Sequence, residues 1–166
     1  MTNNILLRVV TESDLPIFFE QQLDLDSRHM AAFTSKDPTD RLAFLAHWAR
    51  ILNDDANTNM TVLFEGQVAG HIGGFKRLGE PEITYWIGKQ YWGKGIATGA
   101  LSQFLHHLKA RPLYARAAKD NIASIRVLEK CGFTIDGYDK GFSNARGEEV
   151  EEVIMILRAS SSEGRA

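Results

Sequence analysis

The segment Gln90-Tyr91-Trp92-Gly93-Lys94-Gly95-Ile96-Ala97 is the most informative part of this chain. It follows a predicted strand at residues 82–87 and opens a predicted helix that runs to about Leu108. The first N–H groups of a helix have no partner inside it, and the helix dipole favours an anion at that end. Glycine lets the backbone approach phosphate oxygens closely because it has no Cβ. The segment therefore predicts a phosphate-binding turn between a strand and a helix.

Two known phosphate-binding motifs do not fit this segment. The P-loop requires the pattern G-x-x-x-x-G-K-[ST], which the segment does not contain. The dinucleotide fingerprint G-x-G-x-x-G would begin at Gly93 and Gly95, but Thr98 stands where its third glycine belongs. From the spacing alone, an ordinary strand-to-helix turn remains an alternative to phosphate binding.

Hydrophobic periodicity predicts the elements on either side of this turn. Strands are predicted at residues 5–10, 60–64, 68–75, 82–87, 113–118, 134–142 and 150–157. Helices are predicted at about 15–23, 40–52, 96–108 and 121–130. Strands and helices do not alternate regularly, so the order predicts a mixed α/β domain rather than an all-parallel sheet. We expect one domain over residues 1–158 and a polar, flexible tail at 159–166.

The composition restricts the class of partner. The chain has 166 residues, of which 44% are hydrophobic, and a formal net charge of -2. It therefore has no overall positive field for a nucleic-acid backbone, and we expect neither nucleic acid nor a membrane as partner. The N-terminus has no signal-peptide pattern, and the single cysteine, Cys131, fits a cytoplasmic protein. We expect Cys131 to pack as a small apolar residue rather than to act as a nucleophile.

Two motifs of this chain resemble those of the GNAT family of acetyltransferases. Residues 90–95 match the family signature [QR]-x-x-G-x-[GA], which holds the pyrophosphate of acetyl-CoA. Residues 121–133, NIASIRVLEKCGF, resemble the N-x-x-S-x-x-V-L-E-K-x-G-F helix of the RimJ/RimL-like branch. The two motifs occur in the family's order, and the resemblance extends over nearly the whole chain.

The resemblance implies a fold and a cofactor site. The fold is a mixed, mostly antiparallel seven-stranded twisted sheet with about four helices, splayed between strands four and five, here residues 82–87 and 113–118. The co-substrate is acetyl-CoA, whose pantetheine arm pairs with a free strand edge in the splay; no metal is implied. The residues expected to bind acetyl-CoA are Trp86, Ile87, Gln90, Tyr91, Trp92, Gly93, Lys94, Gly95, Ile96, Ala97, Thr98, Asn121 and Ser124. Without the resemblance, Asn121 reads simply as a helix N-cap.

The chemistry of acetyl transfer defines which catalytic groups to look for in the sequence. An amine attacks a thioester only when neutral, so a base and a proton donor for the thiolate are sought. Many relatives place a tyrosine acid where this chain has Leu128. Glu82 is the best candidate base and Tyr85 could present its hydroxyl to the cleft, although a solvated glutamate and a core tyrosine are alternatives. His71 could relay a proton through water or simply pack, and positioning alone could supply much of the rate enhancement.

The resemblance implies an acetyl-CoA-dependent N-acetyltransferase that moves an acetyl group directly to a primary amine. The acceptor is either a protein N-terminal α-amine or a small-molecule amine, and a homodimer is one expected assembly. Acidic residues could attract a cationic acceptor in the predicted loops, namely Asp24, Asp26, Asp54 and Asp55. The missing tyrosine leaves open a non-catalytic acyl-CoA-binding sensor on the same fold. A nucleotide-binding protein of another fold is a weaker alternative.

Overall fold

Seven strands form one sheet in the computed structural model of this protein, which describes residues 4–159. Their order across the sheet is β1-β2-β3-β4-β5-β7-β6. The strands are β1 (Ile5–Val9), β2 (Thr58–Phe64), β3 (Gln67–Arg77), β4 (Glu80–Ile87), β5 (Leu113–Ala118), β6 (Thr134–Ser143) and β7 (Glu148–Leu157). The predicted strands are confirmed, with bounds that differ by one or two residues. Residues 160–166 of the predicted tail lie outside the described residues.

The sheet is antiparallel except between its two central strands, β4 and β5. Their parallel pairing joins Glu82 with Tyr114 and Ile83 with Ala115. Residues 84–87 of β4 continue past the last of these pairs, so one edge of β4 is left free of β5. This confirms the predicted splay between the fourth and fifth strands.

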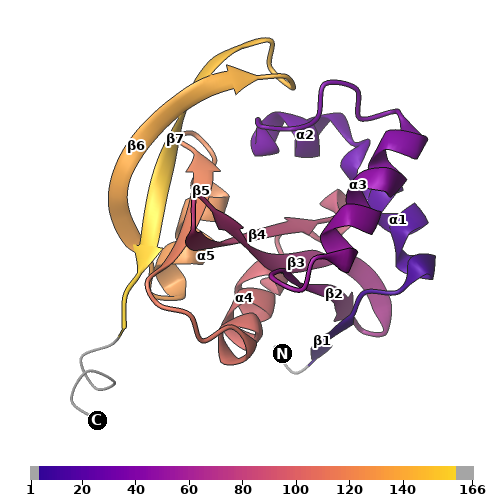
Figure 1. Ribbon diagram of the computed structural model, residues 1–166, viewed down its shortest axis with the longest axis horizontal. Helices are drawn as coiled ribbons and strands as arrows, with labels where there is room; N and C mark the ends of the chain where they lie inside the picture. Colours follow the sequence, from indigo (N-terminus) through magenta and orange to yellow (C-terminus); the bar gives the residue numbers. More distant parts are fainter. Residues whose placement is uncertain (1–3, 160–166) are drawn as a thin grey trace.

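Helices cover both faces of the sheet (Figure 1). On one face, α4 packs on β1, β3 and β4, and α5 packs on β5, over a core that includes Leu101, Phe104 and Met155. On the other face, α1 packs on α3 and β3, around Phe18 and Trp48. The α-helices are α1 (Leu15–Gln22), α2 (Leu25–Ala31), α3 (Arg41–Asn53), α4 (Ile96–His107) and α5 (Ile122–Lys130).

Helix α2 is the element that the sequence did not predict. The described residues form five α-helices, and the prediction of about four omitted this one. Helix α2 has seven residues, and its first, Leu25, is 73% exposed, so no apolar stripe marks it. Its start is set by Asp24, whose side chain accepts hydrogen bonds from the backbone N and Oγ of Ser27. A short helix with a polar surface gives no detectable periodicity.

The β6–β7 hairpin closes over the end of α2 (Figure 1). Three side chains at the hairpin turn donate to backbone carbonyls of α2 and the loop after it: Ser143 to Ala32, Asn144 to Thr34 at 2.8 Å, and Arg146 to His29 at 2.8 Å. These bonds join segments more than a hundred residues apart in the chain. They place α2 above the splay of the sheet.

No helix among the described residues is long and apolar enough to span a membrane.

Candidate active site

The glycine turn lies directly after β4, as predicted. A short 3-10 turn at Lys89–Tyr91 leads into it, and α4 begins at Ile96. Gly93 and Gly95 both have φ of +76°, a conformation that L side chains rarely adopt. A Cβ built on either glycine would meet no atom within 4 Å, so the space above the turn is open. The glycines therefore shape the backbone and leave room for a ligand.

The start of α4 presents unpaired donors to that space. Gly95 is the N-cap and supplies no side-chain cap, and its carbonyl accepts the first helical hydrogen bond from Gly99 N at 3.1 Å. The N–H groups of the first turn, Ile96 to Thr98, consequently have no partner inside the helix. They lie at the positive end of the helix dipole, which is the arrangement that binds phosphate.

A cavity of about 540 Å³ joins this turn to the splay between β4 and β5. Twelve of the fifteen residues named from the sequence line it: Tyr85, Trp86, Ile87, Tyr91, Trp92, Gly93, Gly95, Ile96, Ala97, Thr98, Asn121 and Ser124. Gln90, Lys94 and Glu82 are not among the lining residues. Trp92 also fixes the turn, since its Nε1 donates to Ile87 O at 2.8 Å.

The cavity has further walls that the sequence analysis missed. Helix α2 contributes Ser27, Met30 and Ala31. Helix α5 contributes a row of side chains that continues from Ser124, namely Ala123, Arg126, Val127 and Lys130. Arg126 and Lys130 are four residues apart and so share a face of α5. That spacing of two cations, next to a predicted phosphate turn, could have indicated from the sequence that both line the site. The contribution of α2 could not be predicted from the sequence.

Asn121 has two roles in the structure. Its Oδ1 accepts from Ser124 N at 3.3 Å, which caps α5, and its Nδ2 donates to Met30 O at 3.3 Å. The N-cap interpretation is therefore confirmed. The same side chain also ties α5 to α2 at the edge of the cavity.

Tyr85 brings a hydroxyl into the splay. Its OH lies 2.7 Å from Ser124 Oγ, across the gap between β4 and α5. Burial raises the pKa of Tyr85 to about 12, against the smaller opposing effect of the hydrogen bond to Ser124. Leu128, which stands where relatives carry a tyrosine, is 1% exposed and belongs to the core. Tyr85 is consequently the tyrosine hydroxyl that lines the cavity next to Ser124.

Glu82 lies on the opposite face of β4 from Tyr85, because it is three residues away in a strand. It is 6% exposed, and its two oxygens accept hydrogen bonds from Arg77 at 2.9 and 3.1 Å. Arg116 on β5 approaches the same carboxylate to 3.7 Å and also binds Glu152 and Asp139. Glu82 is therefore part of an ion-pair cluster on the α1–α3 side of the sheet.

Several other candidates from the sequence have structural partners. His71 packs against the rings of Phe18 and Trp48, with centroids at 4.7 and 4.9 Å, and burial lowers its pKa to about 4. Among the acids, Asp26 pairs with Lys89, and Asp54 accepts a hydrogen bond from Ala56 N at 2.9 Å.

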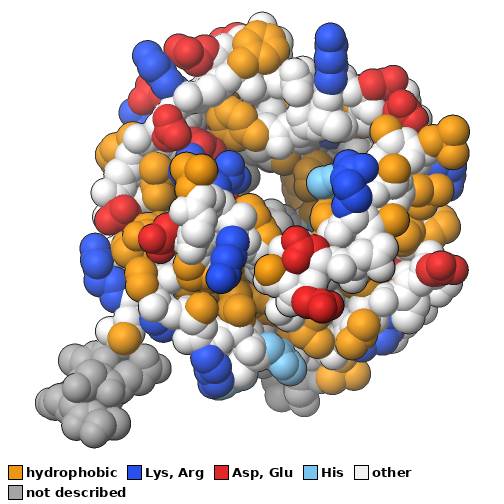
Figure 2. Space-filling model, viewed as in Figure 1, with side chains coloured by type: hydrophobic (Ala, Val, Ile, Leu, Met, Phe, Trp, Pro, Cys, Tyr) orange, Lys and Arg blue, Asp and Glu red, His pale blue; other side chains and the backbone are white. Residues whose placement is uncertain are grey.

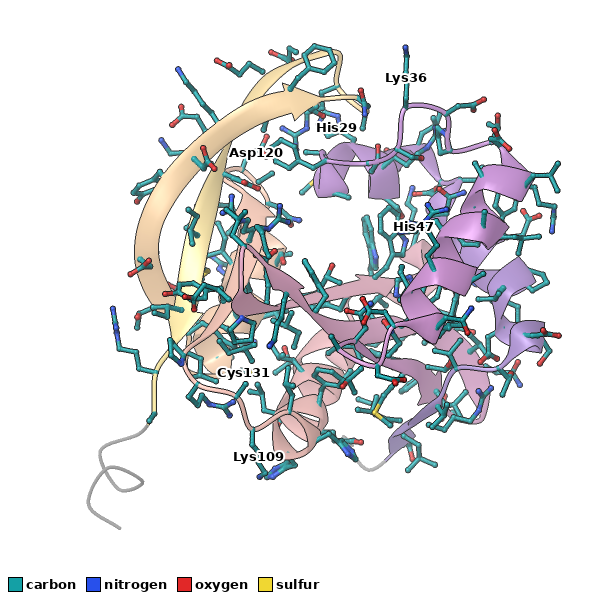
Figure 3. All side chains as sticks on the ribbon, in the orientation of Figure 1. His29, Lys36, His47, Lys109, Asp120 and Cys131 are labelled. Atoms are coloured by element: carbon teal, nitrogen blue, oxygen red, sulfur yellow. The ribbon has the colours of Figure 1, made fainter. Side chains whose placement is uncertain are left out.

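The α1–α3 side of the sheet is hollowed at its centre. Figure 2 shows this hollow, with Lys, Arg, His and acidic side chains around its rim. His47 on α3 lies beside it in Figure 3. Cys131 lies elsewhere, with its Sγ 3.8 Å from Thr98 O, and burial raises the pKa of its thiol. The lone cysteine thus packs against the core as expected.

Comparisons with known proteins agree with this geometry. A model of the acetyltransferase (GNAT) domain matches residues 4–134. A curated relative, the uncharacterized N-acetyltransferase p20 of Bacillus licheniformis, is 27% identical over 83 residues, which are 48% of this chain. The matched region spans 47% of that relative's length.

Solved structures share the fold. RimJ of Mycobacterium smegmatis, in complex with CoA-disulfide, has a TM-score of 0.78 and 20% identity, over 93% of this chain and 82% of that one. Spermidine N-acetyltransferase of Vibrio cholerae, in complex with CoA and spermine, has a TM-score of 0.74 and 19% identity, over 93% and 96%. At these identities the likeness establishes the architecture and leaves the acceptor open.

Proposed function

This chain belongs to the acetyltransferase (GNAT) domain family, and we propose that it moves the acetyl group of acetyl-CoA directly to a primary amine. One observation carries the proposal: a single cavity runs from the glycine turn at the start of α4 to the hydroxyl pair of Tyr85 and Ser124. The turn would hold the pyrophosphate. The free edge of β4 would pair with the pantetheine arm, whose thioester then lies beside Tyr85.

The transfer forms a C–N bond and breaks a C–S bond, and it moves one proton from nitrogen to sulfur overall. The neutral amine nitrogen attacks the thioester carbonyl carbon, gives up a proton, and the tetrahedral intermediate collapses to release CoA, whose sulfur takes up a proton. With a pKa of about 12, Tyr85 is protonated at neutral pH and can donate its hydrogen to the departing sulfur. Ser124 Oγ orients that hydroxyl from α5. Tyr85 would thus do the work of the tyrosine that relatives carry at the position of Leu128.

The base role falls to Glu82 in this proposal, acting through water. Arg77 and Arg116 hold this carboxylate, which is 6% exposed. We therefore infer that a water chain carries the proton from the amine to Glu82. An α-amine has a pKa of about 7.7 to 8.0 and is already partly neutral near pH 7.5, so the demand on the base is small.

Two acceptor classes fit the site: the α-amine of a protein N-terminus, implied by the RimJ/RimL-like motifs, and a small-molecule amine. The spermidine enzyme with the same fold shows that this architecture can serve a small polyamine. We expect either class to enter through the hollow that Figure 2 shows, with an amine at the end of a chain leading toward the splay.

The decisive measurement is thiol release from acetyl-CoA with two acceptor sets, short peptides with free N-termini and small amines. Turnover with peptides alone would assign a protein N-terminal acetyltransferase, and varying the first two residues would then map its preference. Turnover with small amines alone would assign metabolite modification. Acetyl-CoA binding by calorimetry without release from either set would contradict the proposal and favour the acyl-CoA sensor.

A further inference from the structure

Trp86 occupies a distinct position on β4. Successive side chains of a strand point to opposite faces, so Tyr85 points toward α5 and Trp86 toward the side of α1 and α3. Its partner in register on β3 is His71, whose ring packs against Phe18 and Trp48. Trp86 therefore continues an aromatic wall on the side from which the acceptor approaches.

The cavity passes from the CoA side of the sheet to this aromatic wall at Trp86. Tyr85 and Ser124 line it on one side of β4, and Trp86 lines it together with Ser27 and Met30 of α2 on the other. A thioester whose sulfur lies beside Tyr85 must direct its acyl group toward the acceptor side, because the amine arrives there. The first large and rigid side chain that this acyl group meets is the indole of Trp86.

Trp86 lies in the wall of the cavity and is only partly exposed. Its Nε1 is enclosed by protein and has no hydrogen-bond partner among the described residues, so the indole offers the cavity its apolar surface rather than its N–H. Trp92, which lines the same cavity, instead donates its Nε1 to Ile87 O. The wall at Trp86 thus has the bulk and the apolar character expected of a surface that limits the length of an acyl group.

We propose that Trp86 is a specificity-determining residue that restricts the acyl donor to acetyl-CoA by blocking longer acyl chains. This inference rests on the proposed acetyl transfer. Well-packed interiors tolerate extra methylene groups poorly, and pockets of this kind discriminate by about 10- to 200-fold per methylene. Removing the indole would open space toward His71 and admit propionyl and butyryl groups.

The test compares acetyl-, propionyl- and butyryl-CoA with one amine acceptor in the full-length protein. For the wild-type protein, kcat/KM should be lower for butyryl-CoA, which has two more methylene groups, than for acetyl-CoA by a factor of roughly one hundred or more. In Trp86→Ala the kcat/KM values for acetyl- and butyryl-CoA should differ by no more than about threefold. Trp86→Phe, which keeps an aromatic wall, should retain most of the discrimination between the two acyl groups. Trp92→Phe is the matched control and should leave the ratio unchanged, whatever its effect on affinity.

Calorimetric affinities of the three acyl-CoAs separate this inference from the proposed function. Absence of turnover with every acyl-CoA would contradict the acetyl-transfer proposal, and the wild-type affinities would still test Trp86. Equal use or equal binding of acetyl- and butyryl-CoA by wild-type protein would overturn the inference. An unchanged ratio of the kcat/KM values for acetyl- and butyryl-CoA in a Trp86→Ala variant that still binds CoA would also overturn the inference. If that variant does not fold, the wild-type measurements with the three acyl-CoAs decide.

Discussion

The hydroxyl of Tyr85 on β4 lies 2.7 Å from Ser124 Oγ on α5, across the point where β4 and β5 separate. The two residues are 39 positions apart in the chain, and the relationship exists because α5 packs on β5 beside the splay. The contact joins β4, whose edge is free of β5 beyond Ile83, to α5, which carries the second sequence motif. In the proposed acetyl transfer, this contact would hold a protonated hydroxyl beside the departing thiolate.

Tyr85→Phe should lower kcat by roughly 10- to 100-fold, because a positioned proton donor contributes at least this much to such reactions. The affinity for acetyl-CoA should stay within about threefold of wild type, since the phosphate turn is untouched. Steady-state rates and calorimetry measure the two quantities. Tyr138→Phe, at a tyrosine that is 59% exposed on β6, is the matched control. A Tyr85→Phe enzyme with wild-type kcat would remove Tyr85 from the mechanism.

Gly93→Val should weaken acetyl-CoA binding by about ten- to a hundredfold. Its side chain would fill the open space above the turn, and each charge-assisted hydrogen bond lost is worth about 1.5–3 kcal/mol. Gly79→Val is a close control, because Gly79 has φ of +83° and its Cβ would also meet nothing within 4 Å. The backbone strain is then comparable, and only the first variant should lose affinity by calorimetry. Equal affinities in the two variants would contradict the phosphate-turn model.

Glu82→Gln should lower kcat more than CoA affinity if Glu82 accepts the amine proton through water, because the amide cannot accept that proton. Loss of the carboxylate also leaves Arg77 and Arg116 without one partner, so we expect the Tm to fall by a few degrees. Measuring kcat at a temperature at which both proteins are folded separates the two effects, because an ion-pair role alone changes stability and leaves kcat unchanged. A kcat equal to that of wild type would assign the base elsewhere.

Arg146→Ala should loosen α2 from the hairpin. The Arg146 side chain is 8% exposed, binds both oxygens of Asp120 at 2.8 and 2.9 Å, and donates to His29 O. Figure 3 places His29 and Asp120 at this junction. Because Asp120 is largely exposed, we expect a loss of only about 1 kcal/mol in unfolding free energy. Hydrogen exchange should speed up in residues 25–34, and Lys140→Ala, at an exposed pair on the hairpin, should leave that exchange unchanged.

The imidazole of His71, which packs against Phe18 and Trp48, should make the free energy of unfolding fall in mild acid. Its folded pKa of about 4 lies below the usual value of 6.5, so the folded state binds fewer protons between these two pH values. The stabilisation of the folded state by the neutral imidazole is present above pH 6.5 and is lost as the pH falls toward 4. Urea unfolding at pH 7 and pH 5 should show a larger loss for wild type than for His71→Phe. Equal losses of unfolding free energy in the two proteins would mean that groups other than His71 cause the pH dependence.

The local pattern of the sequence determined the strands, the glycine turn and the cap of α5. Alternating hydrophobicity fixes which residues face the core, and Gly93 and Gly95 allow a backbone that other residues resist. The two motifs near residues 90–95 and 121–133 also led to the family, and twelve of the fifteen residues named from the sequence line the cavity. These features depend on contacts within a few residues of the chain.

Only the tertiary structure decided what surrounds those motifs. Helix α2 gives no periodic signal, and its place over the splay depends on bonds from a hairpin more than a hundred residues later. The pairing of Tyr85 with Ser124 and the enclosure of Glu82 by Arg77 and Arg116 likewise join separate strands and helices. The physical reason is that a side chain's direction and neighbours across a sheet follow from strand order and register. Strand order and register depend on packing between residues that are far apart in the chain, and local sequence patterns do not show that packing.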